Sequence, residues 1–280
     1  QPPAAVDNIN LSVVACPTPS ALAASNITTT SALLTWTENG SATDWIIEYK
    51  PSSSTTWSTY QTTSNPDSII NLIPGTSYTA RLRSLCSDTS LYPNSITFQT
   101  VCAAQAVPTP VEGFLTAVPP TTCWSEMQGI LPATGNATLS PITYGWRWNS
   151  NGTPNNATME MYGTSNYWLI SPSVDLGDGT VPAQIEFDVL YTAWNNSNAA
   201  ATGANNIFAV VVSTDDGLTW NAANATIWSN ATGSTRVLDN IPNIPTHIIL
   251  PLFDPATTLP YTGNIKVGFY GQSSGYSTDN

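Results

Sequence analysis

The residues of this sequence that could do acid–base chemistry are one histidine and a set of carboxylates. His247 is the only histidine, and it lies at the start of an apolar run beside Pro245, with no nucleophile motif around it. Nucleophilic hydrolases need a nucleophile, a base and an orienting acid together, and glycosidases need paired carboxylates. The acids follow no spacing that would pair them, and they include Glu126, Glu160, Glu186, Asp188 and Asp254. The sequence therefore predicts a protein without catalytic activity.

A second candidate is the octapeptide at residues 213–220, Ser-Thr-Asp-Asp-Gly-Leu-Thr-Trp. Its Asp and Gly residues suit a tight hairpin turn, and Trp220 is expected to pack back on the sheet. The peptide resembles the Asp-box SxDxGxTW of sialidase propellers. Those enzymes carry the box repeatedly and this chain has it once, so we interpret it as a structural turn.

Composition and charge exclude several classes of partner. Hydrophobic residues make up 41% of the 280 residues, charged residues only 9%, and the net charge is −12. Nucleic acids and anionic membrane surfaces attract clustered Lys and Arg, so neither is an expected partner. No apolar run approaches the roughly 20 residues that a membrane helix requires, so membrane insertion is not expected either.

The four cysteines predict disulfides in an oxidising, extracellular setting. They form no CxxC pair and no Cys/His cluster, which argues against a metal centre. Cys86 has the parity of the inward-facing residues of its strand, and Cys16 enters the first strand of the same domain. We therefore predict a Cys16–Cys86 bridge.

Residues 15–101 read as short antiparallel strands. Ala32, Leu34 and Trp36 alternate with polar residues, as expected for a strand with one buried face. Regular spacing and turn residues between the strands predict an antiparallel sandwich. The predicted strands are residues 31–38, 44–50, 76–83 and 95–100.

This first region closely resembles a fibronectin type III domain. The resemblance lies in Trp36, in the Trp-Ile-Ile-Glu-Tyr of residues 45–49, and in the LxPGTxY corner of residues 72–78. It implies the fold and says little about activity, because this fold serves both as a spacer and as a binding module.

Residues 102–280 predict a larger all-β domain with long loops. No helix-period stretch of useful length occurs in this region. Its strand signals are residues 166–172, 183–191, 207–213, 247–252 and 265–270.

The order of motifs in this region resembles the jelly-roll domain of MAM proteins and of the bacterial cleaved-adhesin or "choice-of-anchor" group. The motifs are Glu112 in the opening segment, Cys123-Trp124, Trp-Leu-Ile-Ser-Pro at 168–172, the octapeptide at 213–220, and Val-Gly-Phe-Tyr-Gly at 267–271. The family then closes with an Ile-Asp-Asn-Val strand, which we do not find at the end of the sequence. Such pairs of domains are typical of large secreted bacterial surface proteins.

The jelly-roll resemblance implies two further features. Cys102 and Cys123 would pair, which would anchor the linker to the sandwich. Related domains hold a structural cation, and Glu112, Asp279 and Asp7 would fit a Ca²⁺ site because Ca²⁺ prefers hard oxygen ligands. The alternative for these three acids is an ordinary solvated surface.

Residues 1–14 carry a strand pattern that has no partner nearby in the sequence. Val6, Ile9, Leu11 and Val13 stand among Asp, Asn and Ser residues, and Val6-Asp7-Asn8-Ile9 has the look of the family's closing strand. We therefore expect this segment to complete the jelly roll of a neighbouring copy, so that 280 residues form one period of a tandem array.

Together these features predict a non-enzymatic structural or adhesive repeat unit of an extracellular surface adhesin or fibre. Its partners would be neighbouring copies and, in addition, glycans or a host surface ligand. The alternative is a carbohydrate-binding accessory module of a secreted hydrolase. Aromatic residues that could stack on sugar rings are Trp146, Trp148 and Trp194.

Overall fold

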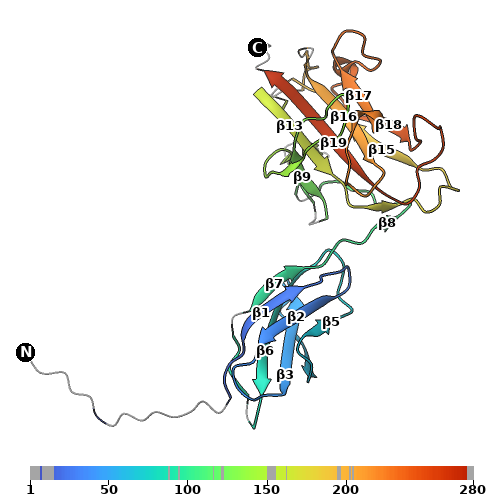
Figure 1. Cartoon of the computed structure of the whole chain (residues 1–280). Helices are drawn as coiled ribbons and strands as arrows, with labels where there is room; N and C mark the ends of the chain where they lie inside the picture. Colours follow the sequence, from blue (N-terminus) through green and yellow to red (C-terminus); the bar gives the residue numbers. More distant parts are fainter. Residues whose placement is uncertain are drawn as a thin grey trace, which may run out of the picture. The chain divides into compact units, whose positions relative to one another are not determined.

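The computed structural model describes residues 7, 16–87, 89–93, 95–115, 117–120, 123–149, 156–161, 163–193, 197–201, 203 and 205–275. The chain divides into two compact units, Gln1–Cys102 and Ala103–Asn280, which run from blue to green and from green to red in Figure 1. Both are built of strands, so the predicted all-β class is confirmed. No helix in the described part of the chain is long and apolar enough to cross a membrane.

The first unit packs a three-stranded sheet, β1-β2-β5, against a four-stranded sheet, β4-β3-β6-β7. All paired strands within it are antiparallel. The strands are β1 (Ser20–Ser25), β2 (Ala32–Thr37), β3 (Asp44–Pro51), β4 (Ser58–Thr62), β5 (Asp67–Ile69), β6 (Ser77–Leu85) and β7 (Ile96–Gln99).

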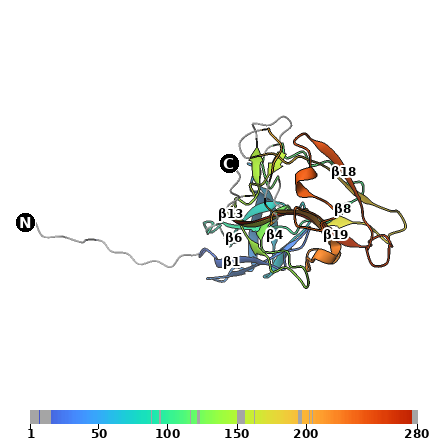
Figure 2. The ribbon, with the colours of Figure 1, turned by 90° about the horizontal axis from the view of Figure 1, so that it is seen from above.

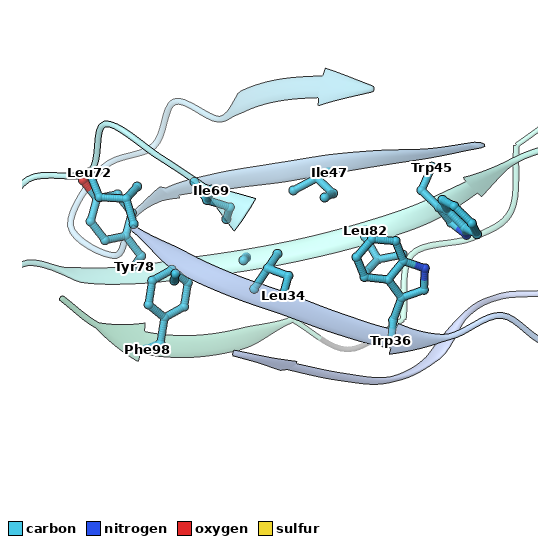
Figure 3. Close-up of a cluster of buried hydrophobic side chains, with 11 residues drawn as sticks. Leu34, Trp36, Trp45, Ile47, Ile69, Leu72, Tyr78, Leu82 and Phe98 are labelled. Atoms are coloured by element: carbon cyan, nitrogen blue, oxygen red, sulfur yellow. The ribbon is translucent and has the colours of Figure 1, made fainter. Parts of the chain in front are cut away.

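The core of this unit comes from the alternation along β2, β3 and β6. Figure 3 shows the inward side chains between the two sheets, with the Trp36 and Trp45 rings edge-on to each other at 5.2 Å. At the other end Tyr78 stacks on Phe98, and its hydroxyl accepts a hydrogen bond of 2.9 Å from the Ile73 N–H. The core residues are Ala32, Leu34, Trp36, Trp45, Ile47, Ile69, Leu72, Tyr78, Ala80, Leu82 and Phe98.

One carboxylate joins strands at the tryptophan end of this core. Glu38 accepts hydrogen bonds from Trp45 Nε1 at 2.8 Å and from Ser84 Oγ at 2.6 Å. Partial burial would raise the pKa of Glu38, but these bonds and one from the Gly40 N–H outweigh it and hold the pKa below its usual value. A charged group thus stabilises the edge of an apolar core.

The second unit contains the remaining elements. They are β8 (Gln105–Ala106), β9 (Ser125–Gln128), β10 (Ser140–Pro141), β11 (Arg147–Asn149), β12 (Asn156–Thr158), β13 (Gly163–Ile170), β14 (Val174–Asp175), β15 (Gln184–Val189), β16 (Ile207–Ser213), η1 (Ala222–Asn224), β17 (Ala225–Ser229), η2 (Leu238–Asn240), β18 (Thr246–Pro251) and β19 (Asn264–Gly275).

β19 is the central strand of the main sheet of this unit. It pairs with β13 and β14 along one edge and with β16 along the other, and the sheet continues through β9 and β10 and through β17 and β8. Figures 1 and 2 show β18 in a layer apart from β13 and β19. Apolar residues therefore cover both faces of the main sheet.

On one of these faces Trp168 lies at the centre of the packed side chains. Its ring lies 5.5 Å from that of Trp220 and 4.6 Å from that of Tyr270, and its Nε1 donates to the Gly129 carbonyl at 2.7 Å. A Cβ on Gly268 would come within 2.9 Å of both tryptophan rings, so the site requires glycine. The opposite face holds Phe208, Val210, Val212, Ile265 and Val267.

Candidate strand-acceptor site

The outer sheet of the second unit has only two strands in the described part of the chain. β15 and β18 pair antiparallel from Gln184↔Pro251 to Val189↔Thr246. No other described strand pairs with either of them. In the described part of the chain a two-stranded ribbon thus faces a main sheet of eight strands. Strand edges with unpaired N–H and C=O groups can accept another strand.

The inward residues beside β15 are only partly covered. Phe187 lies 5.5 Å from Phe269 of β19 and 6.4 Å from Phe208 of β16, measured between ring centroids. Phe208 is buried, whereas Phe187 and Phe269 are partly exposed. The residues that share this partial burial and pack against the same core include Ile185, Phe187, Val189 and Phe269. β15 therefore covers this part of the apolar core only incompletely.

Two further observations concern the packing of this core. Trp146 packs against the same cluster, and its buried Nε1 donates to no acceptor among the described residues. A hollow of about 120 Å³ also lies between the sheets and is lined by Ile185, Val210, Leu250 and Tyr261 among others. Buried donors are nearly always paired, so the acceptor of Trp146 Nε1 is expected outside the described residues.

The predicted donor residues Val6, Ile9, Leu11 and Val13 lie outside the described residues. Their strand role stays a prediction.

On the outer face of the β15–β18 sheet, His247 of β18 lies between two carboxylates of β15, and it is the only histidine of the sequence. His247 Nδ1 lies 2.9 Å from Asp188 Oδ1, and Nε2 lies 3.5 Å from Glu186 Oε2. The β15–β18 register places Asp188 opposite His247, which sequence spacing could not reveal. In the described part of the chain no hydroxyl or thiol is hydrogen-bonded to this imidazole, so the group lacks the nucleophile of a hydrolytic triad.

The structure describes two of the three residues predicted to bind Ca²⁺. Asp7 and Glu112 are exposed, Glu112 accepts a hydrogen bond of 2.7 Å from the Phe114 N–H, and Asp279 is outside the described residues. Among described residues, no group of three or more His, Cys, Asp or Glu could hold a metal ion. Calcium binding stays a prediction.

The predicted Cys16–Cys86 disulfide is present, with a Cα–Cα distance of 5.9 Å. Cys102 and Cys123 are also disulfide-bonded. Because Cys16 and Cys86 are bonded to each other and no cysteine is free, Cys102 and Cys123 form the second disulfide.

The octapeptide at residues 213–220 forms a turn in which polar groups of the peptide hydrogen-bond to one another. Asp215 accepts hydrogen bonds from Ser213 Oγ at 2.7 Å and from the N–H and hydroxyl of Thr219 at 2.9 and 2.7 Å. Asp216 and Gly217 have positive φ angles of 59° and 91°, as the tight turn requires. Trp220 is buried and donates from Nε1 to the Gly217 carbonyl at 3.1 Å. The structural interpretation of this motif fits these contacts.

Replacing Asp215 with Asn is expected to destabilise the second unit by about 1–2 kcal/mol, because an amide cannot accept all three hydrogen bonds. Partial burial would raise the pKa of Asp215, but its hydrogen bonds outweigh this and lower the pKa. The stabilisation is therefore full above the unfolded pKa of about 3.9 and is lost as pH falls through the folded pKa.

The measurement is urea unfolding of the wild type and the variant at pH 7 and through acid pH. The control is Asp216→Asn, whose carboxylate makes only a surface contact of 4.0 Å with Lys266. Equal losses from both variants, or a difference that does not shrink at acid pH, would refute the role of Asp215.

The three tryptophans considered for sugar stacking have different outcomes. Trp146 is part of the core, Trp148 is 42% exposed, and Trp194 is outside the described residues. One exposed ring offers a single stacking platform.

Comparison with known proteins identifies the first unit. The family model of the fibronectin type III domain matches residues 17–100. The first unit is a fibronectin type III domain, and the resemblance predicted from Trp36 and residues 72–78 is confirmed. No curated protein matches the chain.

Similar solved structures each correspond to about a third of this chain, with a TM-score of 0.28. One, titled "Myokine structure", is 16% identical, and its match covers 30% of this chain and 95% of the other. The FN5 domain of Drosophila Lar is 14% identical, with coverage of 30% and 96%. A computationally redesigned β-sandwich protein is 24% identical, with coverage of 32% and 94%.

Proposed function

We propose that this chain, whose first unit is a fibronectin type III domain, is a non-enzymatic structural or adhesive unit of an extracellular surface protein. Its second unit is a jelly roll of the MAM and cleaved-adhesin kind. Units link in series because the second unit of one copy accepts a strand from another copy.

The observation that supports this proposal is the two-stranded outer sheet. β15 and β18 are the only described strands of that layer, and the inward Phe187 and Phe269 stay partly exposed. A strand added along β15 would pair with its backbone and cover these rings. Burying such apolar area contributes about 25 cal/mol per Å².

Residues 5–14 supply a strand of suitable pattern. Ile9, Leu11 and Val13 share one parity and would face the interior, while Asn10 and Ser12 would face water. The one charged residue of the segment, Asp7, shares this parity and lies near the start of the segment, whereas Val6, the fourth predicted donor residue, has the opposite parity.

An extracellular location agrees with the covalent chemistry of the chain. All four cysteines are in disulfides, which persist in oxidising compartments, and fibronectin type III domains with disulfides are typically extracellular.

The test is binding of a fluorescent peptide of residues 5–14 to the full chain, followed by anisotropy. We expect saturable binding that is lost when the peptide carries Leu11→Asp, because a buried carboxylate has no partner there. Phe187→Ala in the full chain should weaken binding of the unchanged peptide, whereas Tyr144→Ala, at an exposed aromatic residue that is not part of the core cluster around Phe187, should not.

Equal binding of the two peptides would contradict strand addition. Binding to glycan arrays that disappears with Trp148→Ala would instead support the carbohydrate-binding alternative, for which Trp148 is the exposed one of the two candidate tryptophans that the structure describes.

A further inference from the structure

The outer face of the four-stranded sheet in the first unit gathers all the cations of that unit. Residues 1–102 contain three Lys or Arg residues, Lys50, Arg81 and Arg83. The inward residues of β3 and β6 are Trp45, Ile47, Tyr78, Ala80, Leu82 and Ser84, so the three cations alternate onto the opposite face. With Trp57 and Tyr92 they form what we call the basic face.

Aromatic rings hold these cations in place. Arg81 lies 4.1 Å from the centroid of the Trp57 ring and 4.2 Å from that of Tyr92. Lys50 lies 5.3 Å from the Trp57 ring, and Arg83 lies 4.8 Å from the Tyr92 ring. Stacking of this kind restrains long side chains that would otherwise lose entropy on binding a partner.

Only one of the three charges is neutralised within the described part of the unit. Arg81 binds Glu48 Oε2 through Nε and Nη2, both at 2.6 Å. Lys50 donates to the Ser54 carbonyl, and Arg83 Nη1 donates to Thr89 Oγ1 at 3.4 Å. Neither makes an ion pair with a described carboxylate, and Arg83 Nε has no hydrogen-bond acceptor there. Within the described part of the unit, Lys50 and Arg83 thus make no ion pair, and Arg83 interacts electrostatically with Glu48.

The second unit carries the negative charge that complements the basic face. Residues 103–280 contain 12 Asp or Glu residues and three Lys or Arg residues. Glu186 and Asp188 are among the exposed acids, with side chains 50% and 67% exposed, and among described residues their only ion-pair partner is His247. We call Glu186 and Asp188 the acidic row.

The cations left to meet the acidic row lie on neighbouring strands. Glu186 and Asp188 are two residues apart on the outer face of β15. On the basic face Arg81 is already paired with Glu48, so Arg83 of β6 and Lys50 of β3 are the cations that can face the acidic row. The match between the two surfaces is therefore one of charge.

We propose that the basic face of one copy docks on the acidic row of a second copy. This lateral contact is separate from strand addition and does not depend on it. It would bring chains together side by side, with electrostatic complementarity setting the register.

The test is the sedimentation of the full chain as a function of concentration and salt. We expect self-association at low salt that weakens as salt is raised, because salt screens the exposed carboxylates of the acidic row from the partly exposed cations. Arg83→Glu and Lys50→Glu should each weaken association about tenfold or more, since they place like charges opposite each other. Arg147→Glu, the same change at the exposed Arg147–Glu160 pair, should have little effect.

The decisive variant is the charge swap Arg83→Glu with Asp188→Arg, which should restore association in the doubly substituted chain. Thermal unfolding of each variant shows whether the fold survives. A monomeric wild type at low salt, an unchanged dissociation constant in both basic-face variants, or a swap that fails to restore association would overturn the proposal. Repeating the series with Leu11→Asp separates this contact from strand addition, because the salt-dependent step should persist.

Discussion

Replacing Trp168 with alanine is expected to lower the free energy of unfolding of the second unit by about 3–5 kcal/mol. The side chain is 0% exposed and contacts Trp220 and Tyr270, and its Nε1 bond to the Gly129 carbonyl ties a loop to the sheet. Truncation would leave a cavity between the Trp220 and Tyr270 rings and would remove the donor that bonds to the Gly129 carbonyl. Urea unfolding followed by circular dichroism measures the loss.

Tyr144→Ala is the matched control for this prediction. That aromatic residue is 80% exposed, so its removal should change stability by less than about 0.5 kcal/mol. Gly268→Ala tests the same cluster by adding an atom instead of removing a side chain, because the new Cβ would meet both tryptophan rings. If Trp168→Ala unfolds at the urea concentration of the wild type, the two-faced packing around β19 is wrong.

Removing the Cys16–Cys86 bridge by a double Cys→Ser substitution is expected to destabilise the first unit by about 2–5 kcal/mol. The two cysteines are 70 residues apart, so the bridge closes a loop that spans nearly the whole unit and limits the unfolded chain. The effect should fall on the first unit and leave the unfolding of the second unit unchanged.

Calorimetry of the double variant and of Trp168→Ala measures this difference, because each substitution should shift the transition of its own unit. Reduction of the wild-type chain should reproduce the shift in the first unit. A bridge variant that melts at the wild-type temperature would show that the native contacts of the first unit suffice alone.

The sequence allowed the strands of both units to be predicted wherever alternation was strong. Ala32, Leu34 and Trp36 are buried on one face as expected, and the run at residues 207–213 is β16. Period-two spacing determines which face of a strand a side chain occupies. It also located Cys86 on the inward side, which led to the correct bridge.

The candidate sites depend on which strands are neighbours, and spacing does not contain that information. Asp188 meets His247 across 59 residues of sequence, and Glu48 meets Arg81 across 33. The basic face needed in addition the loop positions of Trp57 and Tyr92. Short strands such as β11, β12 and β14 have two or three residues, too few to show a period.

The position of β16 in the main sheet has a consequence for what happens when the second unit opens. Residues 207–212 form an uncharged, proline-free run rich in β-branched side chains, and β17 and β19 seal its two edges. Released from these neighbours, such a segment pairs with identical segments of other molecules in the manner of amyloid. Heating would therefore convert the unit to a precipitate that cooling does not redissolve.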